Sequence, residues 1–222
     1  MLAQKIQELK HKLIEYALLV ENMIAKSIKG LESRDKYLFM EIMQEEEPKA
    51  NEYDNILDEM CTTTIAQFEP LASDLRTVLM ILKMNKDLER MADHVVNISE
   101  SGIILINRPF VKPFQDIFFM AEVAAGMLKD SIAAFVNSDV ALAGQVCERD
   151  EKVDEIGDKI LKDLTKFMTQ EKTDITRSLH VLRIAHNLER IADISTNICE
   201  EVIYIVEGKD IKHHKDEEAP QP

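Results

Sequence analysis

The stretch LERMADHVVNISE (88–100) returns one hundred positions later as LERIADISTNICE (188–200), with eight of the 13 positions identical. The same offset pairs Asp54 with Asp154, without a gap. Chance likeness between helices of similar composition would explain scattered leucine matches, but it explains matched Glu, Arg, Asp and Asn poorly. The sequence therefore indicates an internal duplication.

Apolar residues recur every three or four positions almost everywhere, which is the spacing of amphipathic helices. In the first segment they are Leu9, Leu13, Tyr16, Val20, Ile24 and Ile28. Only 6 Gly and 6 Pro leave little material for turns, so few, long elements are favoured over a β sandwich or barrel. No convincing alternation of period two appears.

Turn and capping residues divide this pattern into six expected helices. The first should stop near Gly30, Pro48 is expected to kink the second, and Pro70 ends it. The remaining boundaries are expected near Ser73, Arg108, Pro113, Asn137–Asp139, Phe167, Thr173–Asp174 and Gly208. We predict an all-α fold of two tandem three-helix bundles, residues 1–108 and 113–208, with a polar tail over 209–222.

The 222 residues include 27 basic and 41 acidic side chains, a net charge of −14. This balance argues against nucleic-acid binding, which needs clustered Lys and Arg, and against docking on anionic lipid. No apolar run approaches the ~20 residues that span a bilayer, and the N-terminus lacks a signal peptide's apolar centre. Three widely spaced cysteines without C-x-x-C fit a reducing compartment. We expect a cytoplasmic protein with no direct membrane insertion.

The repeated block places acidic side chains on one helix face. Glu89 and Asp93 are four positions apart, and Glu189 and Asp193 repeat them. Facing rows are expected from Asp54, Asp58, Asp150 and Asp154. Like charges at this spacing repel unless a cation screens them. Oxygen ligands favour hard ions, so these eight residues are candidate ligands for Mg²⁺, Mn²⁺, Ca²⁺ or iron, with Zn²⁺ as a further candidate.

A plainer interpretation makes the carboxylates solvated faces, paired with Arg90, Arg190, Lys83 or Lys86. Acidic pairs at this spacing are common, but their recurrence in both copies, where flanking positions have diverged, favours metal binding. There is no P-loop, G-x-S-x-G or H-E-x-x-H motif, so no enzyme is expected. A metal-dependent bundle enzyme and a metal-storage protein stay open as alternatives.

The blocks DLRTVLMILKMNKDLERMADHVVNISE (74–100) and TDITRSLHVLRIAHNLERIADISTNICE (173–200) resemble the two halves of the PhoU family of bacterial phosphate-signalling regulators. The ending YIVEGKDIKHH (204–214) resembles that family's C-terminal motif. The resemblance implies the tandem-bundle fold and a cytoplasmic accessory protein that represses the phosphate-starvation response and modulates phosphate uptake. The partners it implies are the ATPase subunit of the phosphate ABC transporter and a sensor histidine kinase.

The resemblance also implies where metal would bind, because some family members hold metal clusters on E/D-x-x-x-D motifs. Here these motifs are Glu89 with Asp93, Glu189 with Asp193, and Asp150 with Asp154. Ala50 stands where the repeat predicts the partner of Asp54, so the first site is incomplete on its second helix. Glu47 and Asp58 share that face and are candidates to compensate. The sequence leaves open which metal binds and whether the chain forms a homodimer.

Overall fold

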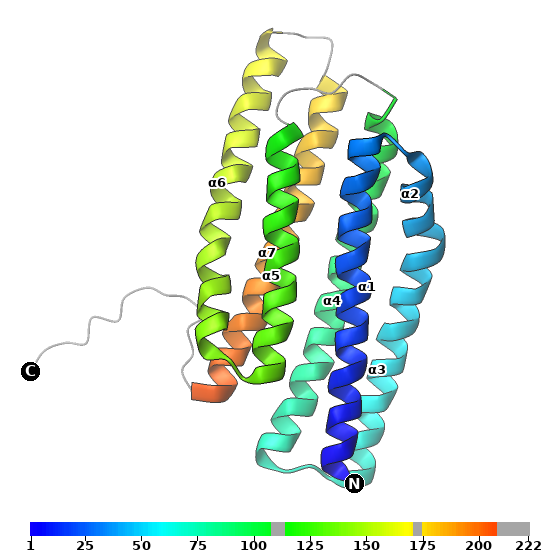
Figure 1. Ribbon diagram of the computed structural model, residues 1–222, viewed down its shortest axis with the longest axis vertical. Coiled ribbons are helices and arrows are strands. Elements are labelled where there is room, and N and C mark those ends of the chain that lie inside the picture. Colours follow the sequence, from blue (N-terminus) through cyan, green and yellow to red (C-terminus); the bar gives the residue numbers. More distant parts are fainter. Residues whose placement is uncertain (108–113, 171–174, 208–222) are drawn as a thin grey trace, which may run out of the picture.

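The structure is a computed structural model that describes residues 1–107, 114–170 and 175–207. Figure 1 shows two helical bundles side by side. The first contains α1 (Leu2–Ser33), α2 (Lys36–Glu41), η1 (Ile42–Glu46), α3 (Glu47–Phe68) and α4 (Ala72–Leu105). The second contains α5 (Phe114–Asn137), α6 (Val140–Gln170) and α7 (Ile175–Glu207). Because α2, η1 and α3 follow one another without a break, the described residues form six long helices, and the predicted all-α fold is confirmed.

Two expected features of the first bundle differ in detail. Helix α1 continues past Gly30, because this glycine is buried inside the helix against Phe39. Before Pro48 the helix widens into a π-helical turn over Ile42–Glu46. Proline lacks the N–H of a regular turn and its ring crowds the carbonyl four residues earlier, so a wider turn is a natural response.

Several predicted boundaries lie outside the described residues: Arg108, Pro113, Thr173–Asp174, Gly208 and the tail over 209–222. Among the helices of the described ranges, none contains a stretch long and apolar enough to cross a membrane.

Helices α4 and α7 run antiparallel (Figure 1). Side-chain hydrogen bonds between them join the two bundles. His94 Nδ1 lies 2.9 Å from the amide oxygen of Asn187. Arg183 donates from Nη2 to Asn97 Oδ1 at 2.5 Å and to Glu100 Oε2 at 2.7 Å. Partner numbers fall on α7 as they rise on α4, so the N-terminal halves of the two copies of the repeated block lie opposite each other.

The first helices of the two bundles also correspond. Ser27 donates to the carbonyl of Ile24 at 2.7 Å, and Ser131 donates to the carbonyl of Leu128 at 2.8 Å. Both serines are buried. Their positions, 27 and 131, place α1 and α5 in register at an offset of 104, compared with 100 for α4 and α7. On this register Met120 takes the place of Tyr16.

Phe39 holds α2 against α1 and α4, and this packing leads to a stability prediction. A Cβ added at Gly102 would overlap the Phe39 ring, and one added at Gly30 would lie 2.8 Å from Phe39 Cζ. We expect Gly102→Ala to destabilise the protein by about 1–3 kcal/mol, because a filled core has no room for a methyl group. Urea unfolding followed by circular dichroism measures this change.

Gly144→Ala is the matched control, because no atom lies within 4 Å of its added Cβ. Alanine is the better helix former, so this variant should be as stable as the parent or more stable. Equal unfolding midpoints for the two variants would contradict the packing role of Phe39.

Candidate metal centres

The second bundle brings four of the predicted carboxylates into one neighbourhood between α6 and α7. Burial raises the pKa of Asp150 to about 6, and the charges of Asp193 and Asp154 add to that rise. Burial and Asp193 also raise the pKa of Asp154, while burial and Asp154 raise that of Glu189. A Cβ at Gly157 would lie 3.2 Å from Glu189 Oε2, so this glycine lets the carboxylate approach α6 closely.

Cations neutralise this second cluster only in part. Arg190 Nη1 donates to Asp193 Oδ2 at 3.1 Å. The Oδ1 atom of Asp150 is buried and has no hydrogen-bond partner. A polar pocket of about 290 Å³ opens beside these residues, and Arg90 from the first bundle forms part of its wall together with Asp150, Arg190 and Asp193. The second site is therefore reachable and lies at the junction of the two bundles.

The first bundle handles the corresponding charges differently, because a lysine reaches them. Lys86 Nζ lies 2.9 Å from both carboxylate oxygens of Asp54 and 3.3 Å from Asp58 Oδ2. The buried amide of Asn85 donates to Asp54 Oδ1 at 2.9 Å. For Asp54 and Asp58 the structure thus shows the ion pairs of the plainer interpretation. In the second bundle His186 replaces Lys86.

Two further acids of the first bundle, Glu89 and Glu47, lie near Asp93. Burial raises the pKa of Glu89, and Asp93 and Asp54 raise it further. Burial also raises the pKa of Glu47, and the charge of Asp93 is the second cause of that rise. Arg90 pairs with Asp87 at 3.3 Å, whereas its counterpart Arg190 pairs with Asp193. Of the two residues that could compensate for Ala50, Glu47 therefore shares the surroundings of Asp93, while Asp58 is held by Lys86.

In neither cluster do the carboxylates surround one point at which a metal ion could sit. Within residues 1–107, 114–170 and 175–207, no three His, Cys, Asp or Glu side chains are placed so that they could hold one metal ion as they stand. The donor chemistry nevertheless suits a hard cation, because the groups are carboxylates and Asp150 has an unsatisfied buried oxygen. Carboxylates without a cation turn apart, so metal binding here requires side-chain rotation.

A buried residue that sequence reasoning assigned only to the apolar face lies beside the first cluster. Tyr16 is fully buried on α1, and its hydroxyl has no hydrogen-bond partner. Burial raises its pKa, and the charges of Asp54, Glu89 and Asp93 raise it further. The sequence offered one signal for this residue, because a tyrosine at a core position of a helix places a hydroxyl among apolar side chains.

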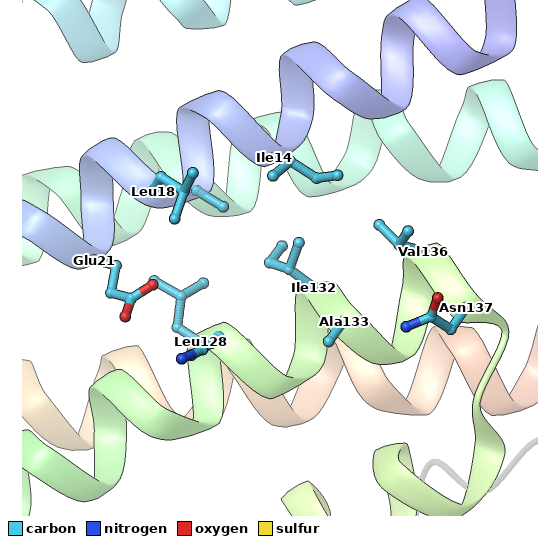
Figure 2. Close-up of a pocket in the computed structure, with 10 residues that line it drawn as sticks. Ile14, Leu18, Glu21, Leu128, Ile132, Ala133, Val136 and Asn137 are labelled. Atoms are coloured by element: carbon cyan, nitrogen blue, oxygen red, sulfur yellow. The ribbon is translucent and has the colours of Figure 1, made fainter.

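A separate apolar surface lies between α1 and α5, the other helix pair that joins the bundles. Figure 2 shows Ile14 and Leu18 from α1 facing Ile132 and Val136 from α5 across a cavity of about 280 Å³. A second hollow of about 740 Å³ continues along the same two helices, and Glu21 lines both. Leu18 is 58% exposed. This groove has the character of a protein-docking surface.

Similar proteins share this duplicated architecture. The family model described as the PhoU domain matches residues 13–102 and 117–202. The chain is 34% identical over 213 residues to a "Phosphate-specific transport system accessory protein PhoU homolog" from Aquifex aeolicus, covering 96% of each chain. It is 30% identical over 217 residues to "homolog 2" from Thermotoga maritima, covering 98% of this chain and 92% of that one.

Solved structures agree with this likeness. The crystal structure of PhoU from Pseudomonas aeruginosa has a TM-score of 0.89 at 27% identity, covering 94% of this chain and 100% of that one. The phosphate transport system regulatory protein PhoU from Streptococcus pneumoniae also has a TM-score of 0.89, at 26% identity, covering 96% of this chain and 100% of that one.

The raised pKa of Asp150 predicts a specific pH dependence. A carboxyl whose folded pKa lies above its unfolded value of 3.8 favours the folded state when protonated, and that contribution is lost as pH rises through about 6. In chelator, Asp150→Asn should therefore raise the melting temperature at pH 7.5, and the gain should shrink at pH 4.5. Scanning calorimetry at both pH values measures this difference.

Asp158→Asn is the control, because its side chain is 72% exposed and lies 3.9 Å from Lys162. Its melting temperature should stay close to that of the parent at both pH values. A pH-independent gain in the Asp150 variant would show that the carboxyl is not held in an unfavourable charged state.

Proposed function

The chain belongs to the PhoU family, and we propose on that basis that it is a cytoplasmic negative regulator of the phosphate-starvation response that modulates phosphate uptake. The observation that carries the proposal is the PhoU domain match in both bundles, at 13–102 and 117–202. The names of its relatives, which describe accessory proteins of phosphate-specific transport, support the same role. In this proposal the chain is an adaptor between the ATPase subunit of the phosphate ABC transporter and a sensor histidine kinase.

We also propose that the carboxylate clusters bind hard metal ions. In the second bundle Asp150, Asp154, Glu189 and Asp193 would hold the ion, and in the first bundle Glu47, Glu89 and Asp93 would do so. A bound cation would supply positive charge between helices that otherwise repel, linking α6 to α7 and α3 to α4. The second bundle is the tighter site, because Asp150 adds a ligand where the first bundle has Ala50 and because no lysine among the described residues pairs with its four acids.

Metal titration of variants that each change the acids of one bundle tests this proposal. Glu189→Gln with Asp193→Asn should remove the tighter calorimetric site for Mn²⁺, while Glu89→Gln with Asp93→Asn should remove the weaker one. In chelator each variant should melt at the parent's temperature or higher, because repulsion is relieved. With Mn²⁺ or Fe²⁺ the parent should gain more stability than either variant, since a ligand of the native state stabilises it.

The same titrations separate the alternatives. Absence of saturable binding of Mg²⁺, Mn²⁺, iron and Zn²⁺ to the parent would leave the clusters as solvated faces. Turnover of a phosphoester by the metal-loaded protein would favour a metal-dependent enzyme instead. Loading of many ions per chain would favour a metal store.

The groove between α1 and α5 is the surface that best suits a protein partner of an adaptor. Its walls are mainly apolar, with Leu18 and Ile132 among them. The charged residues along it are three acids and two lysines: Glu21, Glu32, Glu122, Lys29 and Lys129. The net charge of −14 attracts basic partners and opposes self-association. We propose that a basic amphipathic segment of the transporter's ATPase subunit occupies it.

A single substitution in the groove tests this docking. Leu18→Glu should weaken binding of the purified ATPase subunit by about tenfold or more, because it places a charge in the apolar contact. Leu161→Glu, at a similarly exposed leucine on α6, should leave binding unchanged. Surface plasmon resonance measures affinity, and sedimentation measures oligomeric state. If Leu18→Glu only converts a homodimer to a monomer, the groove is a subunit interface and the docking proposal fails.

A further inference from the structure

Tyr16 is a buried phenol whose surroundings point to a polar role. It is 0% exposed, and its hydroxyl makes no hydrogen bond, although such groups in protein cores are normally paired. Its ring stacks on Tyr53 with centroids 5.4 Å apart and planes at 15°. The charges of Asp54, Glu89 and Asp93 act on this buried phenol, which places it beside the first carboxylate cluster.

A second buried polar side chain approaches the same cluster from α4. Asn85 is 0% exposed and donates from Nδ2 to the backbone carbonyl of Asp54 at 2.8 Å and to its Oδ1 at 2.9 Å. The Oδ1 atom of Asn85 has no partner. Beside this cluster, therefore, one hydroxyl and one amide oxygen each have unused hydrogen-bonding capacity.

The second bundle shows that packing does not require these polar atoms. On the repeat register Met120 replaces Tyr16 and Ala185 replaces Asn85. Met120 is buried, and its Cε would lie 3.7 Å from a Cβ at Gly157, next to the Glu189 carboxylate. An apolar side chain thus fills the corresponding place beside the second cluster. The hydroxyl and the amide of the first bundle need an explanation other than space filling.

We propose that Tyr16 is a positioning residue of the first metal site, where its hydroxyl hydrogen-bonds to a water bound to the ion. This inference rests on the proposed metal binding. Ala50, one helical turn before Tyr53 on the buried side of α3, removes the ligand that Asp150 supplies in the second bundle, so water fills that coordination position. The hydroxyl of Tyr16 and the free Oδ1 of Asn85 are the partners that hold this water, as outer groups commonly do at metal sites.

Tyr16→Phe tests this role, because it removes one oxygen and keeps the stacked ring. The background is full-length protein with Asp150→Asn and Glu189→Gln, which silences the second bundle. Mn²⁺ affinity, measured by calorimetry and by electron paramagnetic resonance of free Mn²⁺, should fall about tenfold or more. The melting temperature in chelator should stay the same or rise, because an unpaired buried hydroxyl has been removed. Tyr53→Phe, on the neighbouring ring, should leave Mn²⁺ affinity unchanged.

The outcomes distinguish the role of Tyr16 from the metal binding on which it rests. Unchanged Mn²⁺ affinity in Tyr16→Phe, or a loss of stability in chelator that parallels the loss of affinity, overturns the role of Tyr16. If the silenced background binds no Mn²⁺ while the parent does, the first bundle holds no site and the inference fails, although metal binding in the second bundle stands. If the parent itself binds no metal, both fail together.

Discussion

Half-buried carboxylates that lie close together need a cation or a proton, and this electrostatic constraint shapes both bundles. The first bundle supplies its own cation, since Lys86 lies 2.9 Å from the carboxylate oxygens of Asp54. The second has His186 at that position, and there burial, followed by the charges of Asp193 and Asp154, raises the pKa of Asp150 to about 6. In the first repeat Lys86 therefore neutralises Asp54 and Asp58 from within, whereas Asp150 of the second repeat keeps a buried oxygen without a hydrogen-bond partner.

The antiparallel pairing of α4 and α7 turns this local difference into a property of the whole molecule. The N-terminal halves of the repeated blocks face each other, so Arg90 of the first bundle reaches the wall of the pocket beside Asp150 and Asp193. The pocket beside the second cluster is thus lined by both bundles, although the four carboxylates of that cluster all come from α6 and α7. On the other helix pair, α1 and α5, a groove lined by Leu18 and Ile132 forms an apolar surface.

The two repeats share one backbone arrangement but neutralise their charged side chains with different partners. At corresponding places on α1 and α5, Lys26 pairs with Glu46 at 2.5 Å and Asp130 pairs with Arg149 at 2.6 Å, with the sign reversed. The buried serines that fix the register make the same backbone hydrogen bond in both bundles. Backbone geometry is therefore shared by the repeats, but polar partners are not, and the two candidate sites differ in chemistry.

The sequence by itself determined the six helices, the duplication and the face on which Glu89, Asp93 and their counterparts lie, because helical periodicity fixes direction around an axis. It also located the gap at Ala50. Only the tertiary structure decided that Lys86 holds Asp54, that Glu47 rather than Asp58 lies near Asp93, and that Tyr16 keeps an unpaired hydroxyl. These depend on which side chains meet across two or three helices, and the spacing of residues along one helix carries no information about its neighbours.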